Sequence, residues 1–373
     1  MKPQNKNKPM NPHRRRLLRA LALVPAVGVV ACGKSGDSGG SPPAVATRTW
    51  KLGFSPVSAR PTPASVINGI DRWSQRSELA IIHEQMPWTD LLGGMSPDAI
   101  LDRDKVDLVN YMRGKGLKLV YMGDLDDGLA RDMEAPQLRA LGRSITEPAV
   151  QQAYQDFMLA VVNKLQPEYV GLAAETNLIR TVAPAALYNA VVTTANNTAT
   201  AIRTAGSTAP LIISVQVETA WGVLAGAGSG TYAGVDQDFT DFPFAEILGL
   251  SSYPYFSYTE PEDIPDDYYT RLLQGHTLPA MVMEGGWAST TDAPLFSSPE
   301  KQARYITRHA DLVDSIDAIA YLQLVFADID LTVFPPPIPP NLPLFVSIGL
   351  TDSDFNGKPA LDAWDALYAR TLV

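Results

Sequence analysis

The sequence contains very little cysteine and histidine, and this scarcity excludes several kinds of chemistry. Cys32 is the only cysteine among 373 residues, so the chain cannot form an internal disulfide. The four histidines include no pair at the spacing of a zinc site. The sequence therefore predicts neither a bound metal nor a cofactor, and stability must come from a large apolar core.

Long hydrophobic runs are also scarce, and the one near the N-terminus predicts an export signal. Arg14, Arg15, Arg16 and Arg19 precede an apolar run over residues 20–31 that is too short to span a bilayer stably. Residues 1–31 are therefore expected to be a signal peptide. Residues 32–47 are rich in Gly, Ser and Pro and are expected to form a flexible tether.

The end of this signal region resembles the signal of a bacterial lipoprotein. Val29-Val-Ala-Cys32 is similar to a lipobox, in which the cysteine becomes the lipidated first residue after cleavage. The arginine cluster also resembles a twin-arginine export signal. The resemblance implies lipidation at Cys32 and an exported protein. Its lipid would anchor it to a bacterial membrane, facing the periplasm or the cell exterior.

Basic residues are too few to balance the acidic ones. The chain has 30 Lys and Arg against 40 Asp and Glu, and seven of the basic residues lie within residues 1–31. Without that segment the formal net charge is −17. Such a chain repels nucleic acid through long-range electrostatics and favours a neutral partner. Nothing in the sequence indicates an oligomeric state.

After the tether, short apolar runs alternate with helical patterns, which is typical of a parallel sheet covered by helices. The runs cover residues 50–56, 79–84, 117–123, 169–175, 211–217, 247–253, 279–284 and 318–325. Eight such runs favour a closed barrel over an open sheet. Residues 48–373 are therefore predicted to form a single (β/α)8 TIM barrel of the α/β class.

Helical periodicity predicts several of the covering elements. The expected helices cover residues 98–113, 148–165, 184–203, 266–274, 299–314 and 360–370. The glycine-rich segment 224–234 is expected to be a loop. The proline-rich segment within 328–349 is also expected to be a loop, bordering the mouth of the barrel after the eighth strand.

Two glutamates at strand ends indicate the chemistry. Glu175 closes the fourth run and Glu284 closes the seventh. Side chains at the carboxyl ends of barrel strands point into the mouth, where this architecture keeps its active site. Two carboxyl groups facing each other there can cleave a glycosidic bond, one as the acid and one as the nucleophile. Glu218 after the fifth run is the first substitute for the acid.

The pattern around these glutamates resembles the clan A glycoside hydrolases. Met283-Glu-Gly-Gly-Trp-Ala-Ser289 is similar to the nucleophile segment of endo-β-galactanases and β-1,3-glucanases, and Leu250-Ser-Ser-Tyr-Pro-Tyr255 to their sixth-strand segment. The resemblance implies that Glu175 is the acid/base, that Glu284 is the nucleophile and that the enzyme retains configuration. One departure is Ala174, where the clan usually has an Asn that contacts the sugar 2-hydroxyl.

Polar and aromatic residues near the strand ends are candidates for contacts with a carbohydrate substrate. They are His83, Gln85, Trp88, Asp124, Asn177, Gln216, Tyr253, Tyr255, Trp287 and Gln323. His83 and Glu84 are adjacent in one run, so only one of them can face the barrel interior. Two alternatives remain at this point: a catalytically inactive barrel that binds glycans at the cell surface, and an enzyme of another class on the same fold.

Overall fold

The computed structural model describes residues 46–224, 226–228 and 230–373. The expected signal peptide of residues 1–31, Cys32 and all but the end of the tether lie outside these residues. Lipidation and export therefore stay predictions. Within the described residues, no helix combines the length and the apolar character needed to cross a bilayer.

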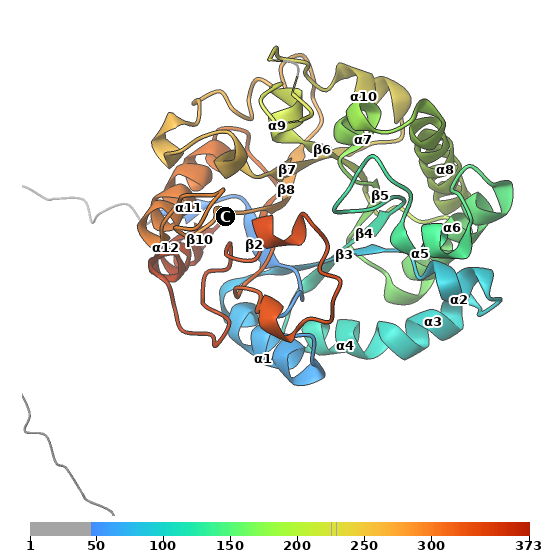
Figure 1. The fold of residues 1–373 in the computed structure, drawn as a ribbon, viewed down its shortest axis with the longest axis horizontal. Helices are drawn as coiled ribbons and strands as arrows, with labels where there is room; N and C mark the ends of the chain where they lie inside the picture. Colours follow the sequence, from blue (N-terminus) through green and yellow to red (C-terminus); the bar gives the residue numbers. More distant parts are fainter. Residues whose placement is uncertain (1–45, 225, 229) are drawn as a thin grey trace, which may run out of the picture. The chain divides into compact units, whose positions relative to one another are not determined.

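Eight parallel strands close into a barrel, which confirms the predicted fold (Figure 1). Each strand pairs with the next along the chain, and the last returns to the first. The strands are β2 (Lys51–Phe54), β3 (Leu79–Gln85), β4 (Lys118–Asp124), β5 (Tyr169–Ala173), β6 (Leu211–Gln216), β7 (Ile247–Ser252), β8 (Ala280–Gly285) and β9 (Ala320–Gln323). The apolar runs predicted all eight, because each strand is buried on both faces.

Helices surround this barrel on its outside (Figure 1). Those before β6 are α1 (Pro63–Trp73), α2 (Trp88–Leu92), α3 (Pro97–Asp104), α4 (Val106–Gly114), α5 (Pro136–Leu141), α6 (Pro148–Ala160), α7 (Thr176–Val182) and α8 (Ala185–Thr204). Those that follow are α9 (Val217–Ala220), α10 (Asp236–Asp241), α11 (Pro299–Asp314) and α12 (Pro359–Tyr368). A short parallel pair, β1 (Thr47–Arg48) and β10 (Thr371–Leu372), joins the two ends of the described chain.

Two helix predictions differ from the structure. The helix expected over residues 98–113 is divided into α3 and α4 at Lys105, whose φ of −125° departs from helical geometry. The segment 266–274 forms consecutive turns instead of a helix. Its Tyr268 and Tyr269 are fully buried, and their hydroxyls bond to Glu218 and Ser252. Tertiary packing therefore outweighs the weak helical pattern there.

The strands alternate between two apolar cores, and this alternation determines which side chains reach the site. One core fills the barrel and includes Leu79 and Ile81 of β3, whereas Ala80 and Ile82 belong to the larger core between barrel and helices. His83 follows the interior series of β3, and Glu84 follows the exterior series. Glu84 accordingly bonds to Lys105 and Tyr121 outside the barrel.

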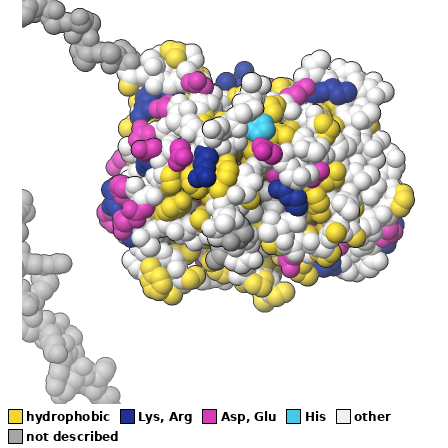
Figure 2. Space-filling model, turned by 90° about the horizontal axis from the view of Figure 1, so that it is seen from above, with side chains coloured by type: hydrophobic (Ala, Val, Ile, Leu, Met, Phe, Trp, Pro, Cys, Tyr) yellow, Lys and Arg dark blue, Asp and Glu magenta, His cyan; other side chains and the backbone are white. Residues whose placement is uncertain are grey.

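The surface carries charges of both signs. Figure 2 shows acidic and basic side chains intermixed on one face, with hydrophobic side chains between them. Many are ion-paired: Arg304, for example, contacts Glu260 at 2.5 Å and Glu262 at 2.7 Å. Such exposed pairs contribute little stability each, so the apolar cores hold the fold together.

Candidate active site

Glu175 stands at the junction of β5 and α7, in a backbone conformation that is uncommon for a side-chain-bearing residue. Its φ of 47° and ψ of 43° are left-handed, and it occupies the N-cap position of α7. The pairing of β5 with β6 also shifts register between Gly171 and Ala173. Strained positions and bulges of this kind are concentrated at functional sites, where they re-aim a side chain.

Glu284 lies within β8 and also depends on a bulge. Met281 and Met283 pack inside the barrel while Ala280 and Val282 pack outside it, so strict alternation would turn Glu284 outward. The register between β7 and β8 shifts at this point, because Leu250 pairs with Val282 but Ser251 pairs with Glu284. The extra residue, Met283, returns Glu284 to the interior.

Ser251, which pairs with Glu284 in the sheet, contacts Glu175 through its hydroxyl. Its Oγ donates a hydrogen bond to Glu175 Oε1 at 2.6 Å. The same hydroxyl lowers the pKa of Glu284, and the charge of Glu284 raises the pKa of Glu175. The two glutamates, 109 positions apart in the sequence, therefore act on each other across one site.

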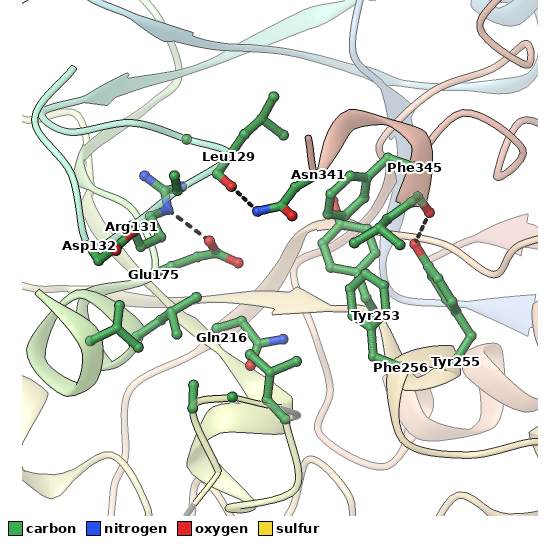
Figure 3. A pocket seen from close by; sticks show the side chains of 18 of the residues that line it. Leu129, Arg131, Asp132, Glu175, Gln216, Tyr253, Tyr255, Phe256, Asn341 and Phe345 are labelled. Carbon is green, nitrogen blue, oxygen red and sulfur yellow. Dashed lines mark hydrogen bonds and ion pairs between the residues drawn. The ribbon is translucent and has the colours of Figure 1, made fainter. Parts of the chain in front are cut away.

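A buried chain of charges links the two glutamates by a second route. His83 Nδ1 lies 3.3 Å from Glu284 Oε2, and His83 Nε2 lies 3.0 Å from Asp124 Oδ2. Asp124 Oδ1 accepts a hydrogen bond from Arg131 at 2.8 Å. Arg131 Nε donates to Glu175 Oε2, also at 2.8 Å (Figure 3). Arg131 also contacts Asp126 at 2.7 Å, so one guanidinium serves three buried carboxyl groups.

This arrangement gives the two glutamates opposite protonation tendencies. For Glu175, burial raises the pKa above its usual range and the charge of Glu284 adds to this, although Arg131 opposes both. For Glu284, burial also favours the neutral form, but the His83 imidazolium prevails and lowers the pKa. Burial opposes protonation of His83, yet Asp124 and Glu284 raise its pKa to about 10. One carboxyl group is thus suited to carry a proton and the other to stay ionised.

A pocket of about 630 Å³ opens beside Glu175 (Figure 3). Loops that follow β4, β6, β7, β8 and β9 supply most of its walls, and Glu175 forms part of one wall. The proline-rich segment contributes Asn341, Leu344 and Phe345, so it borders the site as expected. Asn341 Nδ2 donates to the Leu129 carbonyl at 2.6 Å, which ties this segment to the loop after β4.

Six of the ten predicted substrate contacts lie in the charge network, on the pocket wall or at a strand end nearby. His83 and Asp124 belong to the charge network described above. Gln216, Tyr253 and Tyr255 line the pocket, and Gln85 is partly exposed at the end of β3. The structure holds no ligand, so contact between these residues and a sugar stays a prediction.

The other four are buried away from the pocket wall. Trp88 is 0% exposed and Trp287 is 1% exposed, and both pack in the core between barrel and helices. Gln323 follows the exterior series of β9 and donates to the Ile348 carbonyl at 2.8 Å. Asn177 bonds to the backbone N–H and carbonyl of Gln216. In this structure these four pack around the site, and contact between them and a sugar stays a prediction.

Glu218, the first substitute for the acid, is not on the pocket wall. It is fully buried, and its Oε1 accepts hydrogen bonds from Tyr268 Oη at 2.6 Å and Tyr253 N at 3.0 Å. Burial raises its pKa to about 7. Glu218 therefore fixes the backbone at Tyr253 from behind the pocket.

Sequence reasoning missed Arg131 and Ser251, both of which contact Glu175. Ser251 follows the interior series of β7, so strand alternation could have found it. Arg131 lies in the loop after β4, where no periodic pattern fixes the direction of a side chain. Within the described residues, no cluster of three or more His, Cys, Asp or Glu could hold a metal ion.

Comparison with known proteins finds similarity in fold but none in sequence. No protein-family model and no curated protein matches the sequence. Many solved structures, however, match the chain over most of its length. The fold matches that of glycoside hydrolases.

Three of these structures illustrate the degree of similarity in fold and in sequence. The exo-β-1,4-mannosidase from Opitutaceae bacterium strain TAV5 aligns with a TM-score of 0.64 and 16% identity, covering 87% of this chain and 60% of that one. Xylanase 10B from Thermotoga maritima aligns at 0.57 and 13%, covering 86% and 95%. A GH5_18 protein from Streptomyces cattleya, solved with Manβ1-4GlcNAc, aligns at 0.59 and 13%, covering 85% and 80%. The chain is thus structurally similar to clan A glycoside hydrolases at low identity, and it spans less than two thirds of the mannosidase.

Proposed function

We propose that this protein is a retaining glycoside hydrolase that cleaves a neutral poly- or oligosaccharide, with Glu175 as acid/base and Glu284 as nucleophile. The observation that carries the proposal is the opposed environment of the two glutamates. His83 favours the charged form of Glu284, whereas burial and the charge of Glu284 favour the neutral form of Glu175. A double displacement needs this division.

In the first step, the Glu284 carboxylate attacks the anomeric carbon. The bond from that carbon to the leaving oxygen breaks, and Glu175 gives its proton to this oxygen. The leaving group departs as an alcohol and the sugar remains as an ester of Glu284.

In the second step, Glu175, now ionised, takes a proton from a water molecule. That water attacks the anomeric carbon and breaks the ester, so the sugar leaves with its original configuration. Loss of the first proton leaves Glu175 negative beside Arg131, which stabilises that charged state until the second step.

The test is turnover by two isosteric variants against a panel of neutral polysaccharides and nitrophenyl glycosides. Glu175→Gln and Glu284→Gln are each expected to lower kcat by about a thousandfold or more, since each removes an essential proton donor or nucleophile. Glu84→Gln is the matched control, because Glu84 lies on the same barrel but faces the helices, and it should retain activity. Unchanged turnover in either site variant would overturn the assignment.

A second candidate function has one specific observation in its favour. The Glu175 carboxyl group contacts a buried guanidinium, and the residue before it is Ala174 where the clan usually has Asn. Both features suit a barrel that binds glycans without cleaving them. Binding of a glycan by the wild-type protein without product, on a substrate panel and at several pH values, would favour this function.

We also propose that the protein is exported and anchored to a bacterial membrane by lipid at Cys32. The signal-like segment and the lipobox-like Val29-Val-Ala-Cys32 support this proposal. Cys32→Ser should abolish incorporation of labelled fatty acid and move the protein from the membrane fraction to the soluble fraction. Unchanged labelling in the variant would refute it.

A further inference from the structure

The position of the pocket relative to the two glutamates indicates which part of a substrate it could hold. Glu175 forms part of its wall, whereas Glu284 is not among the residues that line it. In the proposed reaction, which this inference assumes, Glu284 meets the anomeric carbon and Glu175 meets the oxygen of the leaving group. In that reaction, the group that departs would lie in the space beside Glu175.

The walls of this pocket are mainly apolar. Aliphatic and aromatic side chains come from α7 and from loops after five strands, namely Leu129, Ala130, Leu178, Val182, Leu224, Ala227, Phe256, Pro294, Leu295, Leu344 and Phe345. The volume of about 630 Å³ is within the range of pockets that enclose a small organic group.

Most of the polar side chains that the structure describes on the walls have a partner within the protein; the exceptions are the Tyr253 hydroxyl and Asp132. Arg131 is paired with three carboxyl groups, and Gln216 bonds to Glu218 and to the backbone of Thr219. Asn341 donates to the Leu129 carbonyl, and Tyr255 donates to the Leu344 carbonyl at 2.9 Å. Asp132 is exposed at the rim.

A second sugar ring would fit these walls poorly. Each of its hydroxyls needs a hydrogen-bond partner, and each hydroxyl buried without one weakens binding by roughly tenfold. Among the described residues that line the pocket, Tyr253 is the one aromatic whose hydroxyl has no recorded hydrogen bond. An apolar group needs no such partners and gains from leaving water.

We propose that the natural leaving group is an apolar aglycone. This narrows the neutral substrate of the proposed function from a poly- or oligosaccharide to a sugar or oligosaccharide attached to a hydrophobic alcohol, and the bond to that alcohol is the one cleaved. The sugar lies on the Glu284 side and the hydrophobic group occupies the pocket beside Glu175. The ring of loops tied by Asn341 and Leu129 bounds the space in which that group lies (Figure 3).

The experiment compares methyl, butyl, hexyl and octyl glycosides of glucose, mannose and galactose as substrates of the wild-type protein. We expect kcat/KM to rise by up to about fourfold for each added methylene, which is the equivalent of about 0.8 kcal/mol of transfer free energy. In Leu178→Asn and Leu295→Asn, which keep the side-chain size, the octyl-to-methyl ratio of kcat/KM should fall by about tenfold. Leu141→Asn, on the exposed face of α5, should keep the wild-type ratio.

The outcomes separate this inference from the proposed function. Hydrolysis of methyl and octyl glycosides at equal kcat/KM would overturn the apolar aglycone and leave the hydrolase in place. Faster cleavage of oligosaccharides than of octyl glycosides of the same sugar would overturn it too. If nothing is cleaved but calorimetry shows octyl glycosides binding more tightly than methyl glycosides, the pocket assignment is supported and the hydrolase is refuted.

Discussion

Arg131 and Glu175 form a buried ion pair, with the guanidinium Nε 2.8 Å from Glu175 Oε2. Both side chains are almost entirely removed from solvent. Arg131 opposes the role of Glu175 as a general acid. The guanidinium favours the charged form of the carboxyl group, whereas a general acid must begin the reaction protonated. Burial and the charge of Glu284 act in the other direction, and the pKa of Glu175 stays raised.

We expect Arg131→Met to destabilise the fold and to raise the pKa of Glu175 further. The variant leaves Asp124, Asp126 and Glu175 buried without their shared cation, so the free energy of unfolding should fall by about 3–5 kcal/mol. The alkaline limb of the pH–activity profile should move to higher pH. Arg139→Met, which breaks a partly exposed pair with Asp127, should cost about 1 kcal/mol or less. Equal losses in urea unfolding of the two variants would contradict this.

His83→Gln should move the acidic limb of the pH–activity profile to higher pH. His83 carries a positive charge at neutral pH and keeps Glu284 ionised, so its removal raises the pKa of Glu284. In the wild type, the folded-state pKa of His83 is about 10, above its usual 6.5. The stability that protonated His83 contributes is therefore complete below pH 6.5 and is lost as pH rises towards 10. Urea unfolding across this window should show the loss in the wild type and not in the variant.

Ser251→Ala should move both limbs of the profile in the same direction. The Ser251 hydroxyl lowers the pKa of Glu175 and of Glu284, so both pKa values should rise when it is removed. We expect kcat/KM at the optimum to fall by roughly tenfold, as for loss of one hydrogen bond to a charged group. Ser252→Ala is the control, since Ser252 faces outward and bonds to Tyr269. A shift in only one limb would show that the hydroxyl serves one carboxyl group alone.

Glu218→Gln should remove a pH dependence of stability. Burial raises the folded-state pKa of Glu218 from 4.5 to about 7, so the neutral form is favoured in the native protein. This group's contribution is complete below pH 4.5 and is lost as pH rises through 7. Thermal unfolding of the wild type should show that loss between pH 4.5 and 7, and the difference between wild type and variant should change across the same window. A constant difference would refute the prediction.

The barrel could be predicted from the sequence because each strand is an uninterrupted apolar run and eight runs fit one closed sheet. The two glutamates could be found because a charge at the end of such a run is unusual. The turns at 266–274 could not be predicted from the sequence, because their conformation depends on buried contacts of Tyr268 and Tyr269 that no local pattern shows.

The sequence leaves the placement of the polar and aromatic neighbours of the site open, for two physical reasons. Trp88 and Trp287 are of a residue type that can stack against a sugar ring or pack in an apolar core. Burial decides between these roles, and the sequence does not show burial. Gln323 is at the right end of its strand but on the exterior face. Arg131 reaches Glu175 from an irregular loop, where sequence spacing does not fix direction.

The bulge at Met283 and the left-handed turn at Glu175 have a consequence for how this fold can change. Each glutamate reaches the mouth of the barrel through a local break in the strand pattern. The direction of its side chain therefore does not depend on the inward and outward alternation of the other strand residues. The apolar residues of β5 and β8 can exchange for others of similar size while the carboxyl groups keep their direction. Inserting or deleting one residue at either break would instead leave the barrel closed and turn the carboxyl group into the apolar core between the barrel and the helices. These two irregularities, and not the identity of the other strand residues, therefore set the direction of both carboxyl groups.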